Sequence, residues 1–181
     1  MALIVVGGSG RGAGKTALIC GLMRVLPGRL WTAVKITMHA HGQSESIFEE
    51  TAAGQGTDTA RYLAAGARRA LLVTADDDAL GSMVQRILDD HAQPTNVIFE
   101  SNSVLQHLRP DLCFGVVASP TAESKPSFNL VEQCMDASVA LGGHDHAIPG
   151  ERIHFHLASL EKISPPMRAW LEERLPELWR S

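Results

Sequence analysis

The sequence has few cysteines, and they are not arranged as a metal or redox site would require. Cys20, Cys113 and Cys134 are widely spaced, and no CxxC pair occurs. We therefore interpret them as buried thiols rather than metal ligands or redox groups. Free thiols are typical of a reducing compartment, so we expect the protein to be cytoplasmic.

Long hydrophobic runs and long basic runs are also missing. No segment approaches the roughly 18 consecutive apolar residues that indicate a membrane span. The N-terminal apolar run is too short for a signal peptide and has no basic region before it. The formal net charge is −4, which argues against nucleic acid as the main partner. We thus expect neither a membrane nor a nucleic-acid partner.

The overall composition is that of an ordinary globular protein. Apolar residues make up 45% of the 181 residues and charged residues 20%, so the chain should bury a substantial core rather than stay disordered. No internal repeat or linker stands out. We predict a single domain over residues 1–181, with 151–181 as a C-terminal strand–helix extension.

Residues 2–16, ALIVVGGSGRGAGKT, are the most informative stretch. A short apolar strand, a glycine-rich turn, Lys-Thr and an apolar-periodic run follow one another, which is the context of a phosphate-binding loop. Glycine lets backbone N–H groups curve around an anion, and the following helix start favours negative charge. The alternative is a glycine-rich strand–helix turn that binds nothing and is followed by Lys-Thr by chance. The pattern G-x-x-x-x-G-K-[ST] matches except that its first glycine falls on Ser9, which Gly8 and Gly10 flank. It places these residues at the nucleotide: Ser9, Gly10, Arg11, Gly12, Ala13, Gly14, Lys15 and Thr16.

Strand and helix patterns alternate along the rest of the chain. We predict strands at 2–6, 31–37, 69–74, 96–100, 111–118, 137–141 and 153–159. We predict helices at about 15–26, 58–67, 128–135 and 165–175, and one from the acids at 76–78 to about 88. This alternation predicts an α/β fold: a doubly wound, mainly parallel sheet with helices on both faces. With the glycine-rich loop, the type expected is that of a P-loop NTPase.

Residues 38–57 carry no convincing periodicity. A segment of this length without clear structure is unusual inside a domain and is commonly functional or disordered. A short helix around residues 47–53 is one interpretation. We expect any small-molecule acceptor or partner protein to meet the chain at this 38–57 loop.

Four polar residues are expected beside the loop. Mg²⁺ on a nucleotide takes hard oxygen ligands, which we predict to be Thr16, Asp58 and Glu100. Glu100 ends an apolar strand, and the alternative is an acid that simply emerges at the sheet edge. Asp58 begins a helix and could equally be its N-cap. Lys35 lies near the end of a strand, where its ammonium faces either the phosphates or solvent. We assign catalytic roles to Lys15, Lys35 and Asp58.

Histidines form two close pairs, His39 with His41 and His144 with His146. This spacing permits shared metal ligation but does not indicate it, because no third ligand is evident. Their role is left open.

The chain resembles the P-loop proteins of molybdopterin-guanine dinucleotide biosynthesis protein B type, in the class that also contains dethiobiotin synthetase. The resemblance covers residues 2–118. The motifs that carry it are VVGGSGRGAGKTALICGLM, VK at 34–35 before a histidine-containing loop, GTDTARYLAAGARRALLV at 56–73 and NVIFES at 96–101.

That resemblance implies a doubly wound parallel sheet that binds a nucleotide, with GTP in the biosynthesis protein B type. In dethiobiotin synthetases a Thr, an Asp and a Glu bind Mg²⁺ and a strand lysine serves the reacting groups, for which Thr16, Asp58, Glu100 and Lys35 look like counterparts. The chain departs from the family at three points. Ser101-Asn102 follows Glu100 where Glu-Gly is typical, the extra lysine of many relatives would fall at Gly10, and no NKxD motif specifies guanine.

Three functions remain open from the sequence. The first is a slow GTPase or ATPase that serves molybdenum-cofactor biosynthesis. The second is a small-molecule kinase or ATP-dependent ligase, and the third is a nucleotide-binding module without turnover. The choice between GTP and ATP and the oligomeric state stay undecided, and a homodimer is compatible with the sequence.

Overall fold

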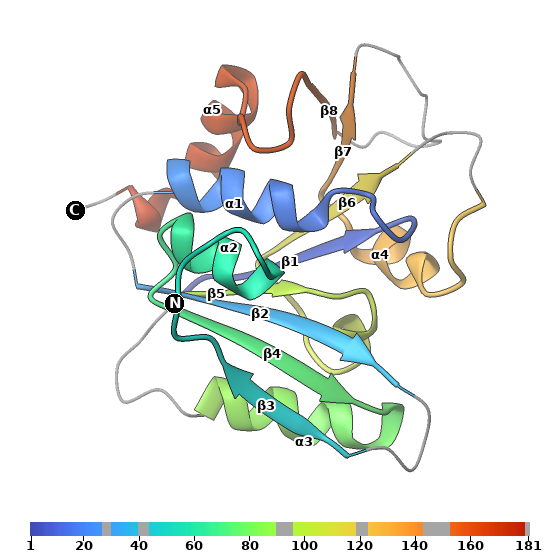
Figure 1. Ribbon diagram of the computed structural model, residues 1–181. Coiled ribbons are helices and arrows are strands. Elements are labelled where there is room, and N and C mark those ends of the chain that lie inside the picture. The colour runs from blue at the N-terminus through green and yellow to red at the C-terminus, as the bar shows by residue number, and fades with distance from the viewer. Residues whose placement is uncertain (27–29, 40–43, 90–95, 119–122, 143–152, 180–181) are drawn as a thin grey trace.

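The computed structural model describes residues 1–26, 30–39, 44–89, 96–118, 123–142 and 153–179. Within these ranges the chain forms an α/β structure (Figure 1). The strands are β1 (Leu3–Gly8), β2 (Trp31–Met38), β3 (Ser46–Glu49), β4 (Arg69–Ala75), β5 (Asn96–Glu100), β6 (Leu112–Val117), β7 (Ala137–Leu141) and β8 (Ile153–Leu157). The helices are α1 (Lys15–Val25), α2 (Asp58–Ala64), α3 (Asp77–Asp89), α4 (Phe128–Cys134) and α5 (Pro165–Arg174), with short 3₁₀ turns η1 (Ser103–Gln106) and η2 (Pro176–Leu178).

One mainly parallel sheet joins all the described strands, in the order β3-β4-β2-β5-β1-β6-β7-β8. Every pairing is parallel except that of β3 with β4. The carboxyl ends of the seven parallel strands therefore lie along one edge, where α/β sheets commonly bind ligands. β1 lies in the interior of this sheet, between β5 and β6 (Figure 1).

Helices cover both faces of the sheet, as the sequence predicts. α1, α2 and α5 pack on one face, and α3, η1 and α4 pack on the other (Figure 1). Each face of the sheet carries its own hydrophobic core, and side chains alternate between the two faces along a strand. In β1, Ile4 and Val6 belong to the core beneath α1, α2 and α5, and Val5 belongs to the core beneath α3 and α4. Strands buried on both faces are continuous apolar runs, which is why β1 and β5 were recognisable in the sequence.

Local capping accounts for where two of the helices begin. The Thr57 side chain accepts a hydrogen bond from the Ala60 N–H at 3.0 Å, so Thr57, rather than Asp58, is the N-cap of α2. Asp76 Oδ1 likewise accepts from the Ala79 N–H at 3.0 Å ahead of α3, which confirms that the acids at 76–78 favour a helix start. Because Thr57 caps α2, the Asp58 carboxylate is available for other partners.

The prediction of a short helix at 47–53 is wrong. Residues Ser46–Glu49 form β3, an antiparallel edge strand whose Ile47 pairs with Val73 of β4. A four-residue segment shows too little periodicity to distinguish helix from strand, and the free edge of β4 decided the outcome. Part of the expected 38–57 loop is therefore sheet.

The three cysteines are free thiols. Cys20 and Cys113 are buried, and Cys134 is partly exposed. Burial raises the pKa of Cys113 to about 12, with smaller contributions from Cys134 and Asp136. Among the described helices, none combines the length and apolar character needed to cross a bilayer.

Candidate functional site

The glycine-rich loop connects the end of β1 to the first residue of α1. Gly14 is the N-cap of α1 with φ of +98°, a left-handed conformation that favours glycine. No capping side chain from the described part of the chain bonds to this helix start. The first N–H groups of α1 are therefore available to an anion.

The Lys15 side chain folds back over this loop. A Cβ atom on Gly8 would lie 2.9 Å from Cγ of Lys15, so the glycine makes room for the lysine. Lys15 Nζ lies 3.5 Å from the carbonyl oxygen of Gly10. Burial lowers the pKa of Lys15, and the nearby ammonium groups of Lys125 and Lys35 lower it further, against the raising effect of Glu100. A bound anion would oppose these effects and favour the charged ammonium.

Ser9 occupies the position where the phosphate-loop pattern has its first glycine. It is buried, and its N–H donates to the carbonyl of Val116 at 2.9 Å. Its hydroxyl oxygen accepts from the Ala118 N–H at 3.0 Å, and its carbonyl accepts from the Lys125 N–H at 2.8 Å. These three bonds attach the start of the loop to the end of β6 and the segment after it.

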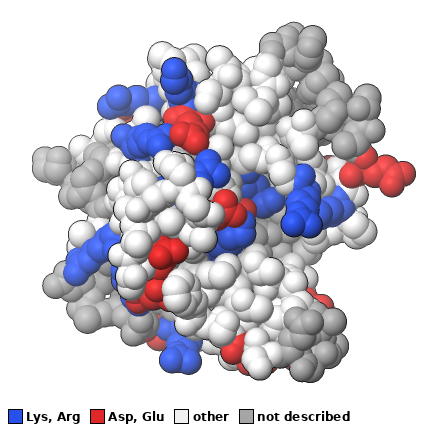
Figure 2. Space-filling view, in the orientation of Figure 1, with Lys and Arg blue, Asp and Glu red and all other residues white. Residues whose placement is uncertain are grey.

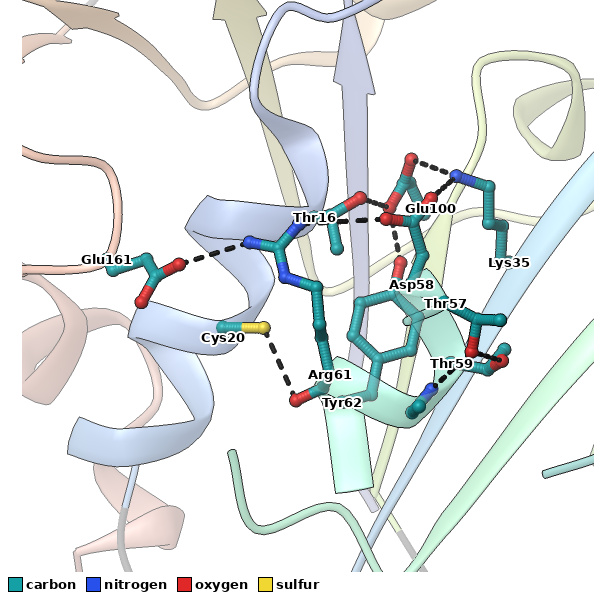
Figure 3. Close-up of polar contacts among 11 residues, drawn as sticks. Thr16, Cys20, Lys35, Thr57, Asp58, Thr59, Arg61, Tyr62, Glu100 and Glu161 are labelled. Atoms are coloured by element: carbon teal, nitrogen blue, oxygen red, sulfur yellow. Dashed lines mark hydrogen bonds and ion pairs between the residues drawn. The ribbon is translucent and has the colours of Figure 1, made fainter. Parts of the chain in front are cut away.

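Glu100 is the centre of a polar network on the β5 side of β1, opposite the β6 contacts of Ser9 (Figure 3). Its side chain is buried at the end of β5. Its carboxylate accepts from Thr16 Oγ1 at 2.6 Å and from the Tyr62 hydroxyl, and Lys35 Nζ lies 3.2 Å from Oε1. The carboxylate therefore combines a cation with two hydroxyl donors, which is how a buried charge is normally stabilised.

Lys35 also pairs with Asp58, from the first turn of α2. Burial alone would lower the pKa of Lys35, but Glu100 and Asp58 outweigh it and raise this pKa. Burial alone would raise the pKa of Asp58, but its bonds to Lys35 and Thr16 and the Arg61 charge hold it below its ordinary value. The Lys35 ammonium thus bridges two carboxylates that come from different elements, and its single positive charge offsets only one of their two negative charges.

Sheet register explains why these residues meet. Lys35 of β2 is the direct neighbour of Glu100 of β5, and Glu100 is the neighbour of Val6 of β1. The glycine-rich loop begins just beyond Val6, so Thr16 at the start of α1 reaches Glu100. The helix α2 lies on the same face and brings Asp58 and Tyr62 (Figure 3). Parallel strand ends converge on one edge, as the sequence argument assumed.

A cavity of about 1160 Å³ extends over this edge. Of the residues predicted for the site, Arg11, Gly12, Gly14, Lys15, Thr16, Lys35, Asp58 and Glu100 line it. Ser9, Gly10 and Ala13 are absent from its lining, and the side chains of Ser9 and Ala13 are buried. Five Lys and Arg residues and three Asp and Glu residues line the cavity, although the whole chain carries −4. Figure 2 shows Lys and Arg side chains gathered across the middle of the molecule, with a few acidic ones between them.

Sequence reasoning missed four residues of this region. Tyr62 bonds Glu100, and Arg61 lies 3.7 Å from Asp58 and 3.1 Å from Glu161. Asn102 holds Gly8 through two bonds, and Lys125 lines the cavity. Tyr62 follows Asp58 by four residues, so a helical-face argument could have found it. Asn102 and Lys125 had no comparable local signal.

The oxygens of Thr16, Asp58 and Glu100 suit Mg²⁺, which prefers hard ligands and retains waters. The three residues belong to one connected network through Lys35 and Glu100. Within the described ranges, no group of three or more His, Cys, Asp and Glu residues forms a metal site. Among the four histidines left open, His41, His144 and His146 lie outside the described residues, whereas His39 lies just after β2.

No protein-family model matches this chain, and no curated protein sequence matches it significantly.

Proposed function

We propose that the chain binds a Mg²⁺–nucleoside triphosphate, GTP or ATP, in the cavity at the end of β1, as a fold of P-loop NTPase type. The observation that carries this proposal is the position of Lys15. It folds over a glycine-rich loop at a helix start, and Thr16, Lys35, Asp58 and Glu100 line the same cavity. Helix N–H groups, a lysine and a hydroxyl are the groups that hold phosphates and their metal.

Electrostatics support an anionic ligand. The cavity gathers more cations than acids in a chain with net negative charge. Lys15 is buried enough that its pKa falls, and bringing an anion to it would remove that cost. A polyphosphate supplies several negative charges at once, which suits a cavity lined by several separate cations.

The donor set for the metal is Thr16, Asp58 and Glu100. In this structure the Lys35 ammonium forms ion pairs with both Asp58 and Glu100. Metal binding by these carboxylates therefore requires at least one of the two ion pairs to break. Freed in this way, the Lys35 ammonium can turn to a phosphate oxygen. Mg²⁺ would neutralise phosphate charge, while Lys15 would hold the phosphates it faces and Asp58 and Lys35 would orient the reacting groups.

Slow hydrolysis fits the described site better than fast turnover. Asp58 and Glu100 are two of the three carboxylates that line the cavity, and both are engaged by Lys35 or by hydroxyl donors. A carboxylate held in this way is a poor base for activating water. We therefore favour a slow NTPase that acts as an accessory factor in molybdenum-cofactor (molybdopterin guanine dinucleotide) biosynthesis, the role suggested by the motifs at residues 2–118.

The cavity also gives some support to a phosphotransferase of dethiobiotin-synthetase type. Ligand pockets commonly measure roughly 300–1,000 Å³, and this cavity exceeds that range. Thr37, Asp77 and Gln106 line the part near α3 and η1. These neutral and acidic groups suit the amine or hydroxyl of a small acceptor better than a phosphate. The third alternative, a module that binds nucleotide without turnover, requires no additional group.

Substitution of Lys15 tests the binding proposal. We expect Lys15→Ala to abolish ATP and GTP binding in calorimetry with Mg²⁺, while circular dichroism and melting remain those of a folded protein. Lys162→Ala is the matched control, since it removes a lysine that does not line the cavity. Unchanged affinity in Lys15→Ala would refute the phosphate-loop assignment. Mass measurement of the nucleotide retained on the purified protein would choose between GTP and ATP.

Turnover measurements separate the three functions. We expect wild-type protein to release phosphate slowly from its nucleotide, with weaker Mg²⁺ dependence in Glu100→Gln. Strong acceleration by a small amine or hydroxyl acceptor would instead identify a phosphotransferase or ligase. Tight binding with no phosphate release under any of these conditions would identify a non-catalytic module.

A further inference from the structure

We propose that Lys125 is a third lysine of the phosphate site and contacts the outer phosphates of the bound nucleotide. This inference rests on the proposed function and adds a residue to the same site. Lys125 lies between β6 and α4, about 110 residues after the glycine-rich loop, and no pattern in the sequence connects it with that loop.

The backbone around Lys125 is held against the loop. Its N–H donates to the carbonyl of Ser9 at 2.8 Å. Two residues further on, Ser127 Oγ lies 3.2 Å from Nδ2 of Asn102. Asn102 in turn accepts from the Gly8 N–H at 2.8 Å and donates to the Gly8 carbonyl at 3.1 Å. The segment 125–127 is thus fixed to the start of the loop directly at Ser9 and indirectly, through Asn102, at Gly8, which places the exposed Lys125 side chain beside the loop.

The charge of Lys125 faces the cavity. Lys125 lines it together with Lys15 and Lys35, and it forms no ion pair with any residue that the structure describes. The Lys125 N–H bonds the carbonyl of Ser9, in the same loop that ends at Lys15. Lys35 already pairs with Asp58 and Glu100, whereas Lys125 has no acidic partner among the described residues, so a polyanion in the cavity would supply one.

Sheet order places Lys35 and Lys125 on opposite sides of the loop. The order β2-β5-β1-β6 puts Lys35 on one side of β1, and the segment after β6 carries Lys125 on the other. Lys15 follows the loop that leaves β1, and so lies between Lys35 and Lys125 in the order of the sheet. The chain has four lysines, and three line this one cavity while Lys162 does not. Lysine is a mobile point charge suited to phosphate oxygens.

The test compares Lys125→Ala with Lys162→Ala by calorimetry in Mg²⁺ buffer, with ATP, GTP and inorganic tripolyphosphate as probes. Both variants remove one exposed lysine charge, and Lys125→Ala keeps the backbone bond to Ser9. We expect Lys125→Ala to weaken all three probes roughly tenfold, the usual scale for one charge-assisted bond. Lys162→Ala should bind them as wild type does, and Lys125→Arg should retain most of the affinity.

The outcomes separate this inference from the proposed function. If wild-type protein binds none of the three probes, both are wrong. If Lys15→Ala loses binding but Lys125→Ala binds as tightly as wild type, only the role of Lys125 is wrong. An equal loss in Lys162→Ala would show a general charge effect and would overturn the assignment. A loss with ATP and GTP but not with tripolyphosphate would place Lys125 at the nucleoside instead, which also overturns it.

Discussion

Glu100 depends on donors that come from three different elements. Thr16 of α1, Tyr62 of α2 and Lys35 of β2 all reach its carboxylate. When a buried carboxylate loses one such partner, the folded state is destabilised by about 1–3 kcal/mol, because the lost bond no longer offsets the cost of removing the carboxylate from water. Burial and the neighbouring Glu100 charge raise the pKa of Tyr62 well above its ordinary value, so its hydroxyl remains a donor throughout the physiological range.

Tyr62→Phe should destabilise the protein with little change in shape. We expect the free energy of unfolding to fall by about 1–2 kcal/mol, because the hydrogen bonds of the Tyr62 hydroxyl to Glu100 and Thr16 are removed. Urea denaturation followed by circular dichroism measures this difference. Ser82→Ala is the control, since that exposed hydroxyl bonds only a carbonyl of its own helix. Equal stability of Tyr62→Phe and wild type would show that these bonds contribute nothing.

Cysteine reactivity should follow burial. Burial raises the pKa of Cys113 to about 12 and also raises that of Cys20, so each of these thiols has a smaller thiolate fraction at pH 8 than an exposed thiol has. We expect one fast-reacting thiol per chain with an aromatic disulfide reagent, and Cys134→Ser should remove it. Two or three fast thiols in the native protein would contradict the burial of Cys20 and Cys113.

The raised pKa of Cys113 also has a consequence for stability. An unfolded thiol loses its proton near pH 8.5, whereas the folded one keeps it up to about pH 12. The unfolded state therefore binds fewer protons between these values, and the free energy of unfolding should fall as pH rises through this window. Denaturation at pH 8 and pH 10 should show a smaller decrease in Cys113→Ala than in wild type. An identical decrease would assign the alkaline loss to other groups.

At the scale of elements, the glycine-rich loop is held as much by its neighbours as by its own glycines. Ser9 bonds the end of β6 and the following segment, and Asn102 bonds Gly8 from the segment after β5. These contacts join the loop to the two strands on either side of β1. The serine in place of the pattern's first glycine is therefore a structural connection rather than a defect of the motif.

Ser9→Gly restores the general pattern but should weaken the protein. The hydroxyl that accepts from the Ala118 N–H is lost, and glycine adds backbone freedom to the unfolded chain. We expect the free energy of unfolding to fall by about 1–2 kcal/mol. Ser9→Ala should show most of this loss without the added freedom. A more stable Ser9→Gly variant would contradict the role assigned to the hydroxyl.

At the scale of the whole molecule, the C-terminal segment lies directly on the first helix. Leu160 is buried against Gly14, where a Cβ atom would lie 2.1 Å from its Cδ1. Glu161 bonds Arg24 of α1 at 2.8 Å and Arg61 of α2 at 3.1 Å. The last strand, β8, joins the same sheet through β7. Residues after 152 thus contact the glycine-rich loop although the chain separates them by more than 140 residues.

Leu160→Ala should therefore affect both stability and ligand binding. Removing this buried side chain leaves a cavity beside Gly14, and we expect a loss of about 2–4 kcal/mol. The loosened loop should also bind nucleotide several-fold more weakly, as measured by calorimetry well below the melting temperature. Leu141→Ala is the control, because Leu141 is 57% exposed. Normal nucleotide affinity in a destabilised Leu160→Ala would show that the loop does not depend on this contact.

The sequence by itself determined most of the secondary structure and part of the candidate site. Apolar runs, capping residues and glycines are local signals, so the alternation of strands and helices could be predicted. The convergence of Lys35, Asp58 and Glu100 was also predictable, because parallel strands end at one edge. The antiparallel β3 was missed because four residues give no reliable period and only the open edge of β4 selected the strand.

Only the tertiary structure decided what surrounds the glycine-rich loop. Gly8 meets Asn102, Ser9 meets Ala118, and Gly14 meets Leu160. Such partners are brought together by the strand order β5-β1-β6 and by the return of the chain over α1, and sequence spacing does not encode either. The physical reason is that hydrogen bonds and van der Waals contacts act over a few ångströms in space. Local patterns act along the chain, so they can identify the loop but not the residues that enclose it.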